Sequence, residues 1–231
     1  MKVLVACEFS GIVREAFAKR GHDAWSCDLL PTEIPGKHIQ GDVLEILNDG
    51  WDLMIAHPPC TYLSNAGIGW FNEDKYKDKA IERKQLRLEA FKFVMRLADA
   101  PIEKIAIENP VGWLNSHWRK PDQIIQPYQF GDEESKRTCL WLKNLNSLQP
   151  TNIVQPKIYG YYKRGNKVGQ PIYGVSYLKF GEDRWKERSR TFRGVAEAMA
   201  EQWGNGWDGL SKRVLDENRG AWEELGKEEK K

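Results

Sequence analysis

The first 28 residues contain the pattern that most restricts the fold of this chain. An apolar run over residues 3–7 predicts a buried strand, and apolar side chains at helical spacing follow from Ile12 to Phe17. Residues 22–27 predict a second strand. A strand, a helix and another strand within about thirty residues are typical of a parallel sheet. With 231 residues, 41% of them hydrophobic, the chain can form one large α/β domain with a small insertion.

Two later predicted strands end in residues that can carry chemistry. Residues 51–56 lead into Pro58, Pro59 and Cys60, and residues 102–107 lead into Glu108. Ligands of open α/β sheets bind at the carboxyl ends of the strands. A single cysteine after a strand is as often a small buried hydrophobe as a nucleophile. A thiol and a glutamate on adjacent strand ends, both at proline breaks, favour the nucleophile.

Other strand ends suggest a binding pocket for a nucleoside. Asp28 ends the second strand, where a carboxylate can accept hydrogen bonds from a ribose, although a solvated aspartate is an equally good interpretation. Asp42 lies in residues 41–47, which predict a third strand end or the cap of a short helix. The loop before the first helix contains Gly11, and a small residue there lets a ligand approach the backbone. This loop lacks the full dinucleotide fingerprint.

The cysteines and the hydropathy restrict the class of protein further. The four cysteines are spaced by 20, 33 and 79 residues, which fits no zinc pattern, so we expect no metal site. Free thiols are typical of a reducing cytoplasm. No apolar run approaches the ~18–20 residues that span a membrane. Because Met1 runs directly into a strand, we expect no leader and a cytoplasmic protein.

Two segments differ from the rest in composition. Residues 61–79 are long for a structureless connection, and their glycines and aromatics suit a lid over a planar ligand. Residues 157–193 contain ten Lys or Arg against three Asp or Glu, with eight aromatics interleaved. Such a composition suits a nucleic-acid backbone and stacked bases, the alternative being a small hairpin subdomain with a solvated face. We therefore expect a catalytic core over 1–150, a target-recognition region over 151–190 and a helical return with a tail over 191–231.

Taken in order, these residues resemble the motifs of the DNA cytosine-5 methyltransferases, in the small form found in phages. The resemblance covers most of residues 3–145 and, more loosely, 188–204. Phe9-Ser10-Gly11 is similar to the motif that holds S-adenosylmethionine. Pro59-Cys60 is similar to the catalytic motif, and Glu108-Asn109 to the pair that holds the cytosine edge.

The resemblance implies a Rossmann-like S-adenosylmethionine-dependent methyltransferase fold, with a mostly parallel sheet, helices on both faces and a small basic recognition insertion. It implies that Cys60 adds to C6 of cytosine and that a methyl group passes from S-adenosylmethionine to C5. The partner is DNA, whose target base leaves the helix, in the cytoplasm of a bacterium or a phage-infected cell. The implied catalytic residues are Cys60, Glu108 and Lys136, and the implied cofactor residues are Phe9, Ser10, Gly11, Asp28, Leu29, Asp42, Val43 and Pro58.

Three other functions stay open at this level. His57-Pro58-Pro59-Cys60 is also similar, except at its last position, to the motif of methyltransferases that act on an exocyclic amine and need no thiol. A protein that binds nucleic acid but has lost catalysis is another possibility, and modification of a free cytosine nucleotide is a third. His57 has no catalytic partner that the sequence can place beside it, so we expect a structural hydrogen bond for it.

Overall fold

The structure is a computed structural model that describes residues 1–174 and 184–204. The tail predicted from residue 208 and part of the basic segment lie outside the described residues. The chain divides into two compact units, which we describe separately. The first consists of Met1–Ile125 and Arg137–Ser147, and the second of Gln126–Lys136 and Leu148–Lys231.

The first unit is built on a seven-stranded sheet in the order β3-β2-β1-β4-β5-β7-β6. Five neighbouring strands run parallel, and β7 is antiparallel to both β5 and β6. This is the predicted Rossmann-like methyltransferase fold, and the prediction of fold class is confirmed. The strands are β1 (Lys2–Ala6), β2 (Asp23–Asp28), β3 (His38–Gln40), β4 (Leu53–Ala56), β5 (Lys104–Pro110), β6 (Gln123–Ile125) and β7 (Thr138–Lys143).

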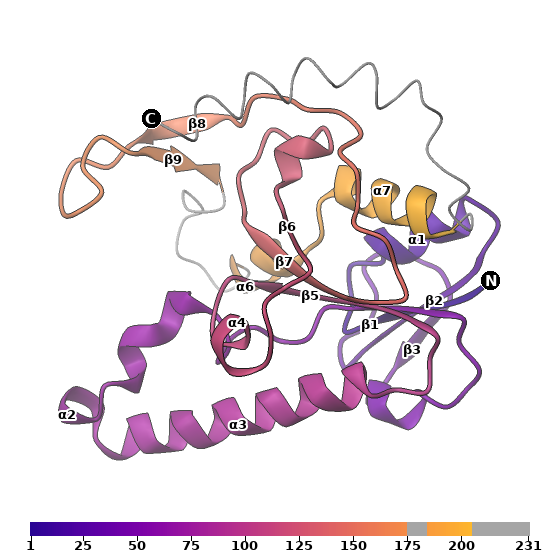
Figure 1. The fold of residues 1–231 in the computed structure, drawn as a ribbon, viewed down its shortest axis with the longest axis horizontal. Helices are drawn as coiled ribbons and strands as arrows, with labels where there is room; N and C mark the ends of the chain where they lie inside the picture. The colour runs from indigo at the N-terminus through magenta and orange to yellow at the C-terminus, as the bar shows by residue number, and fades with distance from the viewer. Residues whose placement is uncertain (175–183, 205–231) are drawn as a thin grey trace. The chain divides into compact units, whose positions relative to one another are not determined.

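Helices cover both faces of this sheet. α1 (Ile12–Ala18) lies on one face and α3 (Asp78–Ala98) on the other (Figure 1). The central strands are buried on both faces, which explains why β4 is an unbroken apolar run rather than an alternating one. On α3, Val94 and Leu97 are buried, whereas Ile81 and Leu88 are exposed. The helix therefore packs chiefly through its C-terminal half.

Of the two alternatives for residues 41–47, the cap of a short helix is confirmed, because Asp42 caps the 3-10 helix η1 (Val43–Glu45), and the strand β3 precedes it. Two other local predictions differ from the structure. Residues 61–79 contain η2 (Asn65–Phe71) and α2 (Glu73–Tyr76), so this segment is not structureless. β5 continues through Glu108 to Pro110, because its pairing with antiparallel β7 extends to its last residue. β6 and the one-turn helix α4 (Leu114–His117) were not anticipated.

The second unit combines two segments of the chain that are separate in sequence. It contains η3 (Pro127–Gln129), the antiparallel hairpin of β8 (Ile158–Tyr161) and β9 (Pro171–Tyr173), α6 (Arg184–Ser189) and α7 (Arg193–Gly204). α7 lies in residues 191–231, where a helical segment is predicted. None of the helices in the described ranges is long and apolar enough to cross a bilayer.

Side-chain hydrogen bonds to α7 explain why residues 126–136 belong with the second unit. The backbone N–H of Gly194 donates to Asp132 Oδ2 at 2.9 Å. Gln202 forms two bonds with the backbone of Gln149, each 2.8 Å long. The first unit accordingly ends at Ser147, near the predicted limit of residue 150, but excludes residues 126–136. The predicted division into catalytic and recognition regions stays a prediction about function.

Candidate active site

The ends of β4 and β5 are joined by two consecutive side-chain hydrogen bonds. The strands run parallel with Ala56 opposite Ile107, so the next residues of each strand, His57 and Glu108, come side by side. His57 Nδ1 lies 2.9 Å from Glu108 Oε2. One position further, Asn109 Nδ2 donates to the Pro58 carbonyl oxygen at 2.9 Å. The strand register therefore fixes the backbone on both sides of this edge.

Cys60 lies just beyond these bonds and is exposed. Its carbonyl oxygen accepts hydrogen bonds from the N–H groups of Leu63 at 3.1 Å and Ser64 at 2.9 Å, which closes a turn. The segment after β5 fastens this turn, because Trp113 N–H donates to the Leu63 carbonyl oxygen at 2.7 Å. Gly112 packs so closely on Leu63 that a Cβ there would collide with its backbone. The thiol thus follows β4, and the glutamate lies in the adjacent strand β5, to which the Cys60 turn is attached.

We call the ends of β4 and β5 together with the Cys60 turn the corner. A cavity of about 500 Å³ opens beside this corner. Its volume is within the range of small-molecule sites. Asp28 and Leu29 line it from the end of β2, and Asp42 and Val43 line it from the turn after β3. Pro59 and Tyr62, on either side of Cys60 in sequence, line it as well. The structure therefore brings four of the predicted cofactor residues to one cavity that reaches the predicted nucleophile's neighbours.

The polar groups of this cavity have distinct environments. Burial raises the pKa of Asp28, and a hydrogen bond from Leu30 N–H, 2.9 Å from Oδ1, partly offsets it. Asp42 Oδ1 accepts from Leu44 N–H at 3.0 Å and so caps η1. Burial, with Asp28 nearby, raises the pKa of Cys27 to about 11, and burial raises the pKa of Cys7 as well. Both thiols are therefore protonated at neutral pH and act as apolar walls.

Phe9, Ser10 and Gly11 do not line the cavity. Gly11 has φ of 74° and precedes α1, where a Cβ would approach Arg14 Nη2 to 2.7 Å, so glycine is required there. The N–H groups at the start of α1 are used internally, because Val13 donates to Glu8 Oε1 at 2.7 Å and Arg14 donates to Oε2 at 3.2 Å. A buried carboxylate of the chain thus occupies the helix end where the sequence suggested a ligand.

Two further predicted site residues, Pro58 and Lys136, are not among the residues that line the cavity. Pro58 is not among its lining residues, although its neighbour Pro59 is. Lys136 belongs to the second unit, where its Nζ donates to the Arg188 carbonyl oxygen at 2.9 Å and lies 5.8 Å from the centre of the Phe192 ring. The roles predicted for both residues stay predictions.

Sequence reasoning missed two features of the corner. One is the contact of His57 with Glu108, which could have been found by aligning the apolar ends of the two predicted parallel strands. The other is the pair Arg83 and Arg87 on α3, whose side chains donate to the carbonyl oxygens of Thr61 at 3.3 Å and Tyr62 at 2.9 Å. Their spacing of four residues on a predicted helix was the available signal.

The same two arginines also hold the segment that follows Cys60. The guanidinium of Arg87 lies 3.3 Å from the centre of the Phe71 ring, and that of Arg83 lies 5.2 Å from it. Burial lowers the pKa of Arg87, with the charge of Arg83 contributing. The predicted lid, residues 61–79, is therefore attached to α3 at its start, residues 61–62, and again at Phe71.

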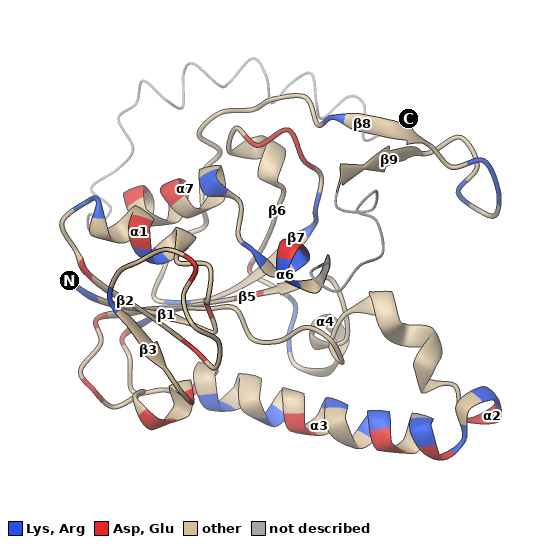
Figure 2. Cartoon of the chain, turned by 180° about the vertical axis from the view of Figure 1, so that it is seen from behind, with Lys and Arg blue, Asp and Glu red and all other residues tan. Residues whose placement is uncertain are grey.

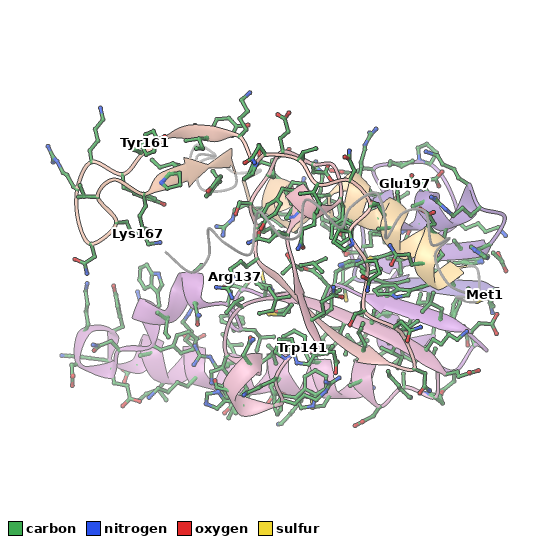
Figure 3. The ribbon with its side chains drawn as sticks, turned by 45° about the horizontal axis from the view of Figure 1, so that its top comes forward. Met1, Arg137, Trp141, Tyr161, Lys167 and Glu197 are labelled. Carbon is green, nitrogen blue, oxygen red and sulfur yellow. The ribbon has the colours of Figure 1, made fainter. Side chains whose placement is uncertain are left out.

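In the second unit, the β8–β9 hairpin has the composition predicted for a nucleic-acid contact. Residues 157–174 contain four Lys or Arg and no Asp or Glu. The connecting loop carries its basic residues together, among them Lys167 (Figures 2 and 3). Tyr161 on β8 is exposed. Basic and aromatic groups therefore alternate on an accessible hairpin.

All four cysteines are free thiols. Within residues 1–174 and 184–204, no group of three or more His, Cys, Asp or Glu side chains is arranged to hold a metal ion.

The chain was compared with protein families, curated proteins and solved structures, and the solved structures include similar ones. No protein-family model matches the chain, and no curated protein matches it in sequence. Among solved structures, the chain is similar to a proposed DNA modification methyltransferase encoded within an E. coli prophage, with 17% identity and a TM-score of 0.42. The similarity covers 66% of this chain and 51% of that chain, about half its length. The fold assignment therefore rests on the strand order and pairing.

Proposed function

We propose that the chain is an S-adenosylmethionine-dependent DNA methyltransferase that acts on C5 of cytosine. The observation that carries the proposal is the arrangement around the β4–β5 edge. Cys60 follows β4 and Glu108 lies near the end of the adjacent parallel strand β5, and a cavity lined by Asp28, Asp42 and Pro59 opens beside them. A thiol and a carboxylic acid at one strand edge suit addition to an electron-poor ring.

The residues around the cavity fit the proposed cofactor. A volume of about 500 Å³ with mostly apolar walls suits a nucleoside, and Asp28 is placed to accept hydrogen bonds from the ribose hydroxyls. Asp42 would meet the adenine amino group, with Leu29 and Val43 against the ring. Bound S-adenosylmethionine supplies an electrophilic methyl group on a sulfonium. We assign Phe9, Ser10, Gly11 and Pro58 to the surroundings of the same site on the resemblance alone.

The chain's own residues would activate the pyrimidine. The Cys60 thiolate forms a bond to C6, and the displaced electron pair moves toward N3, where Glu108 holds a proton. C5 then becomes the nucleophilic carbon. After C5 is substituted, N3 returns its proton to Glu108, the C5 proton leaves to a base and the bond from Sγ to C6 breaks, which restores the ring, the acid and the thiolate. Lys136 is proposed as a basic contact to the substrate.

DNA as the substrate agrees with the accessible basic groups. A base in duplex DNA must leave the stack before a thiol can reach C6. The segment of η2 and α2 begins directly after the Cys60 turn and carries exposed Trp70, which suits closure over an extruded base. The β8–β9 hairpin would contact phosphates through its lysines and bases through its tyrosines.

The deciding experiment is incubation with methyl-labelled S-adenosylmethionine and DNA, followed by mass analysis of the nucleosides. We expect 5-methylcytosine. Label on an exocyclic amine would identify the alternative that the sequence His57-Pro58-Pro59 favours. Label on a free cytosine nucleotide but not on DNA would identify the nucleotide substrate. No labelled product, with DNA still bound, would mean a protein that binds without catalysis.

A cysteine variant separates the two methyltransferase chemistries. Cys60→Ser removes the nucleophile, and we expect kcat to fall at least ~10³-fold, as for loss of a covalent catalyst. Cys139→Ser, the same change at a buried thiol of β7, serves as the control. An amine methyltransferase would keep most of its activity in Cys60→Ser.

A further inference from the structure

His57 lies against Glu108 with little freedom. Only 7% of the His57 side chain and 15% of the Glu108 side chain are exposed, and Nδ1 lies 2.9 Å from Oε2. The other ring nitrogen, Nε2, is buried and has no hydrogen-bond partner among the described residues. The imidazole therefore directs its one hydrogen bond at the carboxyl group to which we assign the acid role.

The geometry favours a proton on Nδ1. An unprotonated Nδ1 would place its lone pair against an oxygen of an ionised Glu108, whereas Nδ1–H donates to that oxygen. A second buried carboxyl, Glu8, is near the ring, since the charge of His57 lowers the pKa of Glu8 against the larger effect of burial. The contact with Glu108 is the one that favours a ring that keeps its Nδ1 proton.

We propose that His57 is a positioning residue for Glu108: its Nδ1–H reserves Oε2 as a hydrogen-bond acceptor, so that the proton offered to the substrate is carried on Oε1. This rests on the proposed function, in which Glu108 acts as an acid toward a ring nitrogen. Oε2 accepts from His57 whether Glu108 is ionised or protonated. The His57 proton stays in place, and the proton that moves belongs to Glu108 alone.

The hydrogen bond from His57 fixes the terminal torsion of the Glu108 side chain, which the strand pairing leaves free. At Glu108 β5 is paired with β7, its pairing with β4 reaches Ile107, and Asn109 is hydrogen-bonded to Pro58, so the backbone is fixed. The terminal torsion of a glutamate is broad and roughly two-fold, so the strands alone do not select which oxygen faces the substrate. With His57 the acid is oriented before the substrate arrives, which lowers the cost of reaching the transition state.

The tautomer of His57 tests the proposal without any methyl transfer. Long-range ¹⁵N–¹H NMR of protein with labelled histidine distinguishes Nδ1–H from Nε2–H. The chain has four histidines, and the signal lost in His57→Asn assigns His57. We expect the Nδ1–H form or the doubly protonated form in the protein without ligand. A neutral ring with its proton on Nε2 would overturn the proposal, whatever the substrate.

Kinetics of two variants test the same bond in the working enzyme. Asn can place an amide N–H near the position of Nδ1, whereas Leu cannot. We expect His57→Leu to lower kcat about 10²-fold, the size of a lost general-acid contribution, with KM unchanged, and His57→Asn to restore most of kcat. His22→Leu, at the opposite edge of the sheet, is the control. Wild-type kcat in a folded His57→Leu protein would refute the positioning role, and so would an equal loss in a folded His57→Asn protein.

Failure of the proposed function gives a different result. If the wild-type protein transfers no methyl group to DNA or nucleotide, the proposed function fails. The NMR measurement still decides whether His57 donates to Glu108.

Discussion

Two loops begin at the carboxyl edge of the sheet, one after β1 and one after β4. They differ in whether their polar groups are hydrogen-bonded within the chain or left accessible. β1 and β4 are parallel neighbours, so both loops begin at equivalent positions. The loop after β1 closes on itself, since Glu8 caps α1 and Arg14 is buried with bonds to Ser26 and Ile34. The loop after β4 leaves Cys60 exposed beside a cavity.

The difference shows that position at a carboxyl edge does not by itself make a binding site. The start of α1 has the N–H groups that bind anions in related folds, but Glu8 already accepts from two of them. The cavity is instead lined chiefly from the end of β2, the turn after β3, the segment around Pro59 and α3. The proposed cofactor site lies on those elements, and the following predictions test the contrast.

The largest effect is expected at Glu108. Glu108→Gln keeps the shape of the side chain but removes the transferable proton, and we expect kcat to fall ~10²–10⁴-fold, the usual contribution of a general acid. Steady-state methyl transfer to DNA measures it. Glu103→Gln, just before β5, makes the same change at an exposed carboxyl and should leave kcat as it is. Equal kcat in Glu108→Gln and wild type would remove Glu108 from the mechanism.

The next largest effect is expected on the affinity of the cavity for S-adenosylmethionine. Asp28→Asn replaces a carboxylate acceptor by an amide, and we expect the affinity for S-adenosylmethionine to fall about 10–100-fold, since hydrogen bonds to charged groups contribute ~1.5–3 kcal/mol. Titration calorimetry measures it. Asp49→Asn, in the exposed turn before β4, is the matched control. Unchanged affinity in Asp28→Asn would mean that the cofactor, if it binds, does so elsewhere.

A smaller effect is expected where the Cys60 turn meets the segment after β5. A methyl group at Gly112 would collide with the Leu63 backbone, so Gly112→Ala should lower the free energy of unfolding by ~1–3 kcal/mol, as overpacking does. Denaturant unfolding measures the change. Gly69→Ala is the control, because a Cβ there would meet no atom within 4 Å. Equal stability of the two variants would show that the turn is not held against Gly112.

The central strands were predictable because parallel strands buried on both faces are continuous apolar runs. Val3, Ile55 and Ile107 belong to such runs, and polar residues mark where each run ends. From this the adjacent placement of the thiol and the glutamate could be inferred. This inference needed only the fold class and the residues that directly follow each apolar run in the sequence.

What could not be predicted depends on register and on three-dimensional turns. The His57–Glu108 bond joins residues 51 positions apart and exists only because Ala56 pairs with Ile107. β5 extends to Pro110 because a distant antiparallel strand pairs with it. The Glu8 cap requires a turn that brings a carboxylate back to Val13 and Arg14. None of these is a property of a local pattern.

The smallest expected effect is a pH dependence of stability that comes from Glu8, in the loop after β1. Burial raises the pKa of Glu8 in the folded protein, against the lowering effects of His57 and the Val13 and Arg14 N–H groups. A raised pKa means that the folded state binds the proton more tightly, so the stabilisation is fully present below the unfolded-state pKa and is lost as pH rises through the folded-state value. Gln imitates the protonated acid and does not titrate. We therefore expect the unfolding midpoint of wild type to fall relative to that of Glu8→Gln as pH rises. Exposed Glu82→Gln should run parallel to wild type, and a parallel Glu8→Gln curve would mean that the buried cap is ionised without cost.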